Sequence, residues 1–218
     1  MKILIVAATK FEIEPLIHQM ENTQHLNEKL ISCAYKKLEI DFLIPGVGMV
    51  ATAYYCGKII NDSYDLALNV GICGSFNTNL EIGAVVNIIQ DHFSELGVED
   101  GQQFLTSKEI GLDAKIEMYN ETIISNNKLD EIPKVCGITV NTVHGNEKSI
   151  EKVFGKFHPN TESMEGAAFM FVCENEGIPY AQIRGVSNFV EKRNKENWNI
   201  PLAIENVSKK VFEILNEF

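Results

Sequence analysis

The stretch that decides the fold is MKILIVAATKFEIE, residues 1–14. Its short apolar run, Lys2–Ala8, predicts a central strand, because parallel strands are covered by other elements on both faces. The residues that follow, from Glu12 to Met20, are expected to form a helix. A buried strand that leads into a helix is the repeating unit of an α/β protein.

The same alternation continues to the end of the chain. Further strands are expected at residues 29–35, 38–45, 66–70, 84–90, 135–143 and 180–186, and further helices at 46–60, 147–154, 163–177 and 204–218. Because tight hairpin signals are few, the pattern predicts a three-layer α/β/α sandwich around a central mixed, twisted sheet. Residues 91–134 are polar and weakly patterned, and they are expected to be loops. No linker or repeat divides residues 1–218, which indicates a single domain.

Composition narrows the range of partners. Acidic residues outnumber basic ones by 30 to 19, for a net charge of −11. Such a surface repels phosphate backbones and anionic lipids, so neither nucleic acid nor a membrane is an expected partner. The five cysteines are widely spaced and form no CxxC pair, which is typical of reduced thiols in a cytoplasmic protein and not of a disulfide framework or a zinc site. No apolar run approaches the ~20 residues that span a bilayer.

Polar residues follow several of the expected strands, where ligands gather in sheets of this kind. Glu12 comes soon after the first strand, and its carboxylate either stabilises a helix N-terminus or serves a ligand. Gly48 ends a Gly-Val-Gly turn that opens a helix; its backbone N–H can receive an oxygen-rich ligand, or the turn is a plain tight turn. Ile72 lies in a third strand-to-glycine junction, GICGS, whose glycines can equally serve close packing.

Two further polar positions lie towards the C-terminus. Glu165, in ESMEGAA, is followed by small residues, so its carboxylate either stabilises the first turn of a helix or points into a cleft, where it would suit a vicinal diol. Asn188 ends the apolar strand that begins with IPYAQI; its amide either reads a ligand or bonds to the local backbone of a turn. His144 and His158 have no second ligand at a metal-binding spacing, so surface or packing roles are favoured.

Four blocks, taken in order, resemble the nucleoside phosphorylase and nucleosidase superfamily: MKILIVAATKFEIE, GVGMVATA, NVGICGSFNTNLEIGAVV and ESMEGAAFMFVCENEGIPYAQIRGVSN. Within the superfamily, the pattern is similar to the methylthioadenosine/S-adenosylhomocysteine nucleosidases and more closely to the futalosine hydrolases of menaquinone biosynthesis. SMEGAA and IRGVSNFVEKRNKENW are the segments that carry the closer likeness.

The resemblance implies that water cleaves the N-glycosidic bond of a purine nucleoside without a cofactor or a metal. By position, Glu12 would activate the attacking water, Glu165 would hold the ribose 2′ and 3′ hydroxyls, and Met164 would pack on the sugar. The resemblance also implies a homo-oligomer, a dimer or larger. The substrate-binding surface would be completed by Gly48, Ile72 and Val143.

Asn188 corresponds to the position that addresses purine N7 and the 6-substituent, where the methylthioadenosine nucleosidases carry Asp. Adenine presents an exocyclic amine, a donor that suits a carboxyl group, whereas hypoxanthine presents O6, an acceptor that a carboxylate would repel. An amide offers an NH2 donor to O6 and a carbonyl to N7–H. Asn188 therefore favours a 6-oxopurine such as hypoxanthine, because a mismatch costs about 1–3 kcal/mol for each group left unpaired.

Phosphorolysis competes with hydrolysis in this superfamily, but it needs cationic side chains around the phosphate, commonly arginines. This chain has no arginine before Arg184, which favours hydrolysis. Arg193 and Trp198 either belong to an exposed loop or line the pocket, where Arg193 would meet the benzoate on the 5′ side of futalosine.

The function predicted from the sequence is therefore that of a nucleosidase that hydrolyses futalosine and releases hypoxanthine. The closest alternative is a methylthioadenosine/S-adenosylhomocysteine nucleosidase, which differs only in the base and the 5′ group. A non-catalytic nucleoside-binding protein is the alternative from another class. The retention of both Glu12 and Glu165 speaks against it.

Overall fold

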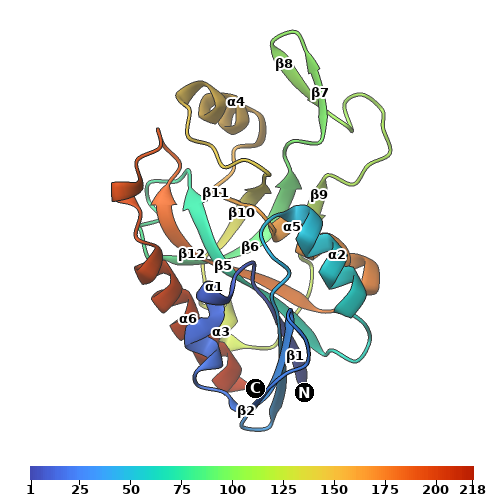
Figure 1. Ribbon diagram of the computed structural model, residues 1–218. Helices are drawn as coiled ribbons and strands as arrows, with labels where there is room; N and C mark the ends of the chain where they lie inside the picture. The colour runs from blue at the N-terminus through green and yellow to red at the C-terminus, as the bar shows by residue number, and fades with distance from the viewer.

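The computed structural model describes residues 1–218 as a large central sheet with helices on both of its faces and a separate two-stranded hairpin (Figure 1). The helices are α1 (Lys10–Ile17), α2 (Met49–Ile59), α3 (Asn127–Asp130), α4 (Glu147–Phe157), α5 (Gly166–Glu176) and α6 (Ile200–Glu217), with a short 3-10 turn at Lys195–Asn197. The strands are β1 (Lys2–Val6), β2 (Glu21–His25), β3 (Leu30–Tyr35), β4 (Leu38–Leu43), β5 (Leu66–Ser75), β6 (Val85–Phe93), β7 (Gly97–Asp100), β8 (Gln103–Thr106), β9 (Glu117–Tyr119), β10 (Lys134–Thr139), β11 (Thr161–Ser163) and β12 (Tyr180–Phe189).

The sheet is mixed, with a parallel centre. Parallel pairing runs through β12, β5, β1 and β4, and antiparallel β3 and β2 extend the edge beyond β4. On the other side β6 pairs antiparallel with β12, and β10 and β11 follow in parallel. Because β11 also pairs antiparallel with β5, five strands close into a ring. This closure brings the chain that follows β11 to the C-terminal end of β5.

Both faces of the sheet are buried, and β1 shows how they are filled. Ile3 and Ile5 belong to a buried cluster with residues of α1 and α6, whereas Leu4 and Val6 belong to a cluster with residues of α2 and α5. Successive side chains of a strand point to opposite faces, so a strand between two layers must be apolar throughout. Figure 1 shows α1, α3 and α6 on one side of the sheet and α2 and α5 on the other. The predicted α/β/α sandwich is confirmed.

The last helix begins four residues before the expected apolar stripe. Asn199 caps it, because the side-chain oxygen accepts a hydrogen bond from the Leu202 N–H, and Pro201 lies in the first turn. Both features are typical of helix N-termini. None of the helices is both long enough and apolar enough to span a bilayer.

The expectation of loops for residues 91–134 is wrong in part. In this segment β6 continues to Phe93, and β7, β8, β9 and α3 follow. Strands β7 and β8 pair only with each other, and their hairpin projects from the body of the protein (Figure 1). Strand β7 is mostly exposed and β8 is only half-buried, so the hairpin has little need of alternating apolar residues and its sequence carried no strand signal.

Candidate active site

A cavity of about 340 Å³ lies where the C-terminal ends of β1, β5 and β12 meet the residues between β11 and α5. The parallel pairing of these three strands brings their ends to one edge of the sheet. Apolar side chains cover much of the wall, and polar ones converge on it, as is usual for a small-molecule site. The charged and amide side chains in the lining are Glu12, Glu162, Glu165, His144 and Asn188.

Glu12 lies at the N-terminus of α1 and is 7% exposed. Its Oε2 accepts hydrogen bonds from the backbone N–H and the hydroxyl of Thr9, both at 2.9 Å. Its Oε1 accepts one long bond, 3.3 Å, from the Ile72 N–H. Both alternatives drawn from the sequence therefore meet in one residue: Oε2 stabilises the start of the helix, and Oε1 keeps a lone pair for a ligand.

Glu165 precedes α5 and is 6% exposed. Its Oε1 accepts a hydrogen bond from the Gly48 N–H at 3.0 Å. Burial raises the pKa of Glu165 above its usual value and the charge of Glu12 adds to the rise, while Arg184 and the Gly48 N–H oppose it. The Gly48 N–H is thus engaged by Glu165, and Gly48 is not among the residues that line the cavity.

The positive charge of the site comes from Arg184, on β12. From the sequence this residue had no expected role in the site, and it counted only as the first arginine of the chain. The side chain is 1% exposed, and its Nη1 lies 3.9 Å from Glu165 Oε2. Nη2 donates to Asn69 Oδ1, and Nε donates to Gln182 Oε1 at 3.2 Å. An arginine inside an apolar strand was the signal that could have identified it, because a fully buried cation needs partners.

Gly71 makes room for the groups that meet here. A Cβ at this position would lie 2.5 Å from Arg184 Nη1 and 2.7 Å from Glu12 Oε1. The guanidinium and the Glu12 carboxylate therefore share the space above Gly71, which no other residue type would leave open. The sequence predicts close packing as one role for the glycines of GICGS, and this glycine has it.

A further buried carboxylate, Asp91, lies behind Arg184. Gln182 links the two, because its Nε2 donates to Asp91 Oδ2 at 2.9 Å while its Oε1 accepts from Arg184. Thr139 Oγ1 donates to Asp91 Oδ1 at 3.0 Å and accepts from the Ala167 N–H at 2.7 Å. Burial raises the pKa of Asp91 to about 6, against the effect of these hydrogen bonds. These hydrogen bonds form a relay from Arg184 through Gln182, Asp91 and Thr139 to the backbone of Ala167 in the first turn of α5.

Asn188 is presented by a bulge in β12. The residue pairs with Gly74 across a register shift that leaves Ser187 unpaired, and both Ser187 and Asn188 line the cavity. Bulges of this kind re-aim a side chain. Asn188 Oδ1 accepts from Ser187 Oγ at 2.8 Å, and Nδ2 donates to the Phe189 carbonyl at 2.9 Å. This is the local bonding of a turn residue, yet one N–H and one lone pair of the amide remain for a ligand.

The remaining expected residues divide into two groups. Ile72, Val143 and Met164 line the cavity together with Glu12, Glu165 and Asn188, whereas Gly48 and Arg193 do not. Arg193 is exposed, and its guanidinium carbon lies 5.9 Å from the centroid of Trp198, which does line the cavity.

From the sequence His144 had no expected partner, but the structure shows that it has one. Its Nδ1 lies 2.6 Å from Glu162 Oε2, and both residues line the cavity. The signal for Glu162 was its position three residues before Glu165 in TESMEG. No sequence signal joins His144 to Glu162, because the contact depends on the pairing of β10 with β11.

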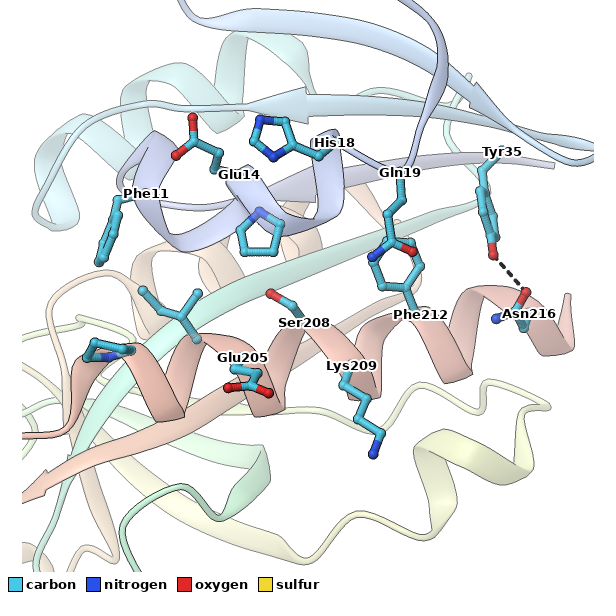
Figure 2. Close-up of a pocket in the computed structure, with 13 residues that line it drawn as sticks. Phe11, Glu14, His18, Gln19, Tyr35, Glu205, Ser208, Lys209, Phe212 and Asn216 are labelled. Atoms are coloured by element: carbon cyan, nitrogen blue, oxygen red, sulfur yellow. Dashed lines mark hydrogen bonds between the residues drawn. The ribbon is translucent and has the colours of Figure 1, made fainter.

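A larger hollow of about 690 Å³ lies between α1 and α6 (Figure 2). In it, Tyr35 Oη donates to Asn216 Oδ1 at 2.9 Å. Glu14 and His18 lie above α1, away from α6, and the charged residues of α6 lie along its far edge (Figure 2). The charged groups thus occupy the two rims and do not converge, so this hollow is not the candidate site.

Comparison with known proteins shows the family of this chain. A family model described as "Phosphorylase superfamily" matches residues 2–218. The chain belongs to the phosphorylase superfamily. The family expected from the sequence is confirmed.

Two curated relatives and one solved structure represent these similarities. A 5′-methylthioadenosine/S-adenosylhomocysteine nucleosidase of Buchnera aphidicola is 28% identical over 236 residues, which cover 100% of this chain and 97% of the relative. A futalosine hydrolase of Acidothermus cellulolyticus is 25% identical over 172 residues, which cover 75% and 70%. The structure of futalosine hydrolase from Helicobacter pylori aligns with a TM-score of 0.84 at 18% identity and covers 100% of this chain and 98% of that one. The last likeness concerns the fold alone.

Gly166 tests whether the relay behind Arg184 holds the start of α5. A Cβ here would lie under 3.0 Å from Gln182 Oε1 and Asp91 Oδ2. Gly166→Ala should therefore lower the free energy of unfolding by about 1–3 kcal/mol, the usual effect of overpacking. Urea denaturation followed by circular dichroism measures the change.

The matched control is Gly155→Ala in α4, where a Cβ meets nothing within 4 Å. This variant should be as stable as the parent or more stable, because alanine favours a helix over glycine by about 1 kcal/mol. Equal stability of the two variants would contradict the tight packing of α5 on the relay.

Proposed function

We propose that the protein is a purine nucleosidase that hydrolyses the N-glycosidic bond of futalosine and releases hypoxanthine. The observation that carries the proposal is the convergence of two buried carboxylates, Glu12 and Glu165, and one amide, Asn188, on a single apolar cavity. The two named relatives, one a methylthioadenosine/S-adenosylhomocysteine nucleosidase and one a futalosine hydrolase, support the class of reaction.

Glu12 is assigned to the attacking water. Its Oε2 is held by two donors of Thr9, so the carboxylate cannot turn, and Oε1 is left to accept a proton. As the bond between C1′ and N9 breaks, the water oxygen bonds to C1′ and its proton passes to Glu12. A positioned general base typically contributes 10²–10⁴-fold in rate.

Glu165 is assigned to the ribose hydroxyls, and Met164 to the face of the sugar. A carboxylate accepts from both hydroxyls of a vicinal diol. Its negative charge also stabilises the positive charge that develops on the ribosyl group as the bond stretches. Because burial raises the pKa of Glu165, the ionised form that does both is lost at a higher pH than for an ordinary glutamate.

Asn188 is assigned to the departing base. Its free N–H suits O6 of a 6-oxopurine, and its free lone pair suits N7–H. Because an amide does not ionise, the proton that reaches the base comes from solvent or from tautomerisation of the purine.

Hydrolysis is assigned in preference to phosphorolysis on electrostatic grounds. No lysine or arginine is among the residues that line the cavity, whereas three carboxylates are. Arg184 is buried behind them, with Asn69 and Gln182 as its partners. A phosphate dianion in this cavity would meet net negative charge, and water would not.

Futalosine is preferred over methylthioadenosine as substrate because of Asn188 and Arg193. The guanidinium of Arg193 lies outside the cavity beside Trp198, which lines it, and from there it would meet a carboxylate on the 5′ side of the ribose. The alternative is a methylthioadenosine/S-adenosylhomocysteine nucleosidase. It is favoured by the 28% identity to the Buchnera relative over the whole chain.

A panel of substrates tests the proposal. Futalosine, aminofutalosine, methylthioadenosine and inosine, each with and without phosphate, are incubated with the purified protein, and the freed base is measured by chromatography. Futalosine should be cleaved fastest, to hypoxanthine, at a rate that does not depend on phosphate. Faster release of adenine would transfer the assignment to the methylthioadenosine enzymes, and dependence on phosphate would make the protein a phosphorylase.

Replacement of Glu12 tests its assignment to the water. Glu12→Gln should lower kcat by about 10²–10⁴-fold while KM changes little, because the amide keeps the shape of the side chain but accepts no proton. Glu14→Gln is the matched control, since Glu14 is on the same helix and lines the other hollow. Steady-state rates on the best substrate of the panel measure both. Turnover by Glu12→Gln at the rate of the control would remove Glu12 from the mechanism.

We also propose that the protein is a homo-oligomer with α2 at the interface. Val50 and Tyr54 are 78% and 55% exposed and, four residues apart, share one face of the helix. Val47, 57% exposed, lies just before the helix and also lines the cavity, so a partner on α2 would lie close to the cavity mouth. Light scattering should give the mass of a dimer or larger for the parent and of a monomer for Val50→Lys. A monomeric parent would refute the interface.

A further inference from the structure

The pair of His144 and Glu162 has no role in the mechanism above, although both residues line the cavity. Glu162 is 4% exposed. Its Oε1 accepts from the backbone N–H of His144 at 3.0 Å, and its Oε2 lies 2.6 Å from His144 Nδ1. Because an ionised carboxylate only accepts, Nδ1 carries the proton in this contact. The two bonds fix the carboxylate and leave further lone pairs on both oxygens.

Glu162 lies next to the amide that is assigned to the base. On β11 it pairs with Gly74 of β5, and Asn188 on β12 pairs with the same glycine from the other side. A Cβ on Gly74 would lie 3.2 Å from Asn188 Nδ2 and 3.6 Å from Glu162 Cγ. The two side chains therefore stand side by side above a residue that has none, at one end of the cavity.

Glu162 has no lysine or arginine as a partner, and its one ion-pair contact is with His144. His144 supplies both of the hydrogen bonds that the carboxylate accepts, and no lysine or arginine lines the cavity. A buried carboxylate with unused lone pairs is an acceptor that awaits a donor. The Asn188 amide keeps one free N–H after its bonds to Ser187 and Phe189, and that N–H is assigned to O6, so the donor for Glu162 is expected from the ligand.

We propose that Glu162, held by His144, accepts the N1–H of a 6-oxopurine and so decides which base the protein takes. The proposal rests on the assignment of this cavity to a purine. On hypoxanthine, O6 and N1–H are adjacent, and Asn188 and Glu162 present a donor and an acceptor in the same order. On adenine, N1 carries a lone pair, which a carboxylate repels. Glu162 is thus the second specificity-determining residue, and His144 is a positioning residue.

A structural role for the same pair makes a different prediction. Glu162 joins β11 to the loop that follows β10, and it would then stabilise this loop whatever the ligand. Loss of such a contact would weaken all bases alike. Loss of a base-reading contact changes their order.

The test is the binding of free bases, which does not require catalysis. Kd values for hypoxanthine, 1-methylhypoxanthine and adenine are measured by calorimetry for the parent and for Glu162→Gln. In the parent, hypoxanthine should bind tightest, because it alone offers N1–H. In Glu162→Gln, hypoxanthine should weaken by about 10- to 100-fold relative to adenine, because the amide can turn a donor towards N1 of adenine.

Two further variants complete the design. Glu147→Gln, the same charge change at an exposed residue of α4, should leave all three Kd values unchanged. His144→Leu keeps Glu162 and its backbone contact but removes the Nδ1–H, so it should weaken hypoxanthine in the same direction by a smaller factor. This variant keeps the test decisive if Glu162→Gln does not fold.

Each outcome separates this proposal from the assignment of the substrate. An unchanged ratio of hypoxanthine to adenine in Glu162→Gln, or equal weakening of all three bases, overturns the role of Glu162 even when the parent cleaves futalosine. Selective loss of hypoxanthine binding upholds it even when futalosine is not the substrate. A parent that binds adenine more tightly than hypoxanthine overturns both.

Discussion

The buried guanidinium of Arg184 is the interaction on which the cavity depends. It lies 3.9 Å from Glu165, shares the space above Gly71 with Glu12, and reaches Asp91 through Gln182. Burial of three carboxylates without a cation would be strongly destabilising, whereas one paired cation offsets part of that cost. A lysine could not replace it, because only the planar fork of arginine donates from Nε and Nη2 to two separate partners while it carries the charge.

The region holds one arginine and four buried carboxylates, those of Glu12, Asp91, Glu162 and Glu165, so it is negative, and this imbalance fits its chemistry. Burial raises the pKa values of Glu165 and Asp91, which records the cost of holding them ionised. A ribosyl group becomes positive as its base departs, and the net negative charge of the carboxylates stabilises it. The same field excludes anions from the inner cavity, while Arg193, outside it beside Trp198, can receive a carboxylate at the rim.

The sequence predicted the parts of the site that depend on neighbours along the chain. Glu12 follows β1, and Glu165 precedes α5, so their places at element ends could be inferred from apolar patterning. Arg184 was missed because a charge within an apolar strand has no pattern of its own, and its partners come from other strands. The contact of His144 with Glu162 depends on how β10 pairs with β11, which periodicity does not reveal. The hairpin of β7 and β8 was missed because most of it is exposed or half-buried, so it needs no clear alternation of apolar residues.

The amide at Asn188 and the carboxylate at Glu162 together constrain how the base can leave. In the proposed arrangement Glu162 accepts from N1–H, so negative charge on the departing ring is disfavoured, and no side chain at that end supplies a proton to relieve it. Asn188 has a lone pair left after its bond to Ser187, and this lone pair suits N7–H but not unprotonated N7. The base is therefore expected to leave as the neutral N7–H tautomer, protonated from solvent before the bond to C1′ is fully broken. A carboxylic acid in place of Asn188 would itself deliver this proton, whereas the amide can only bind the ring that already carries it.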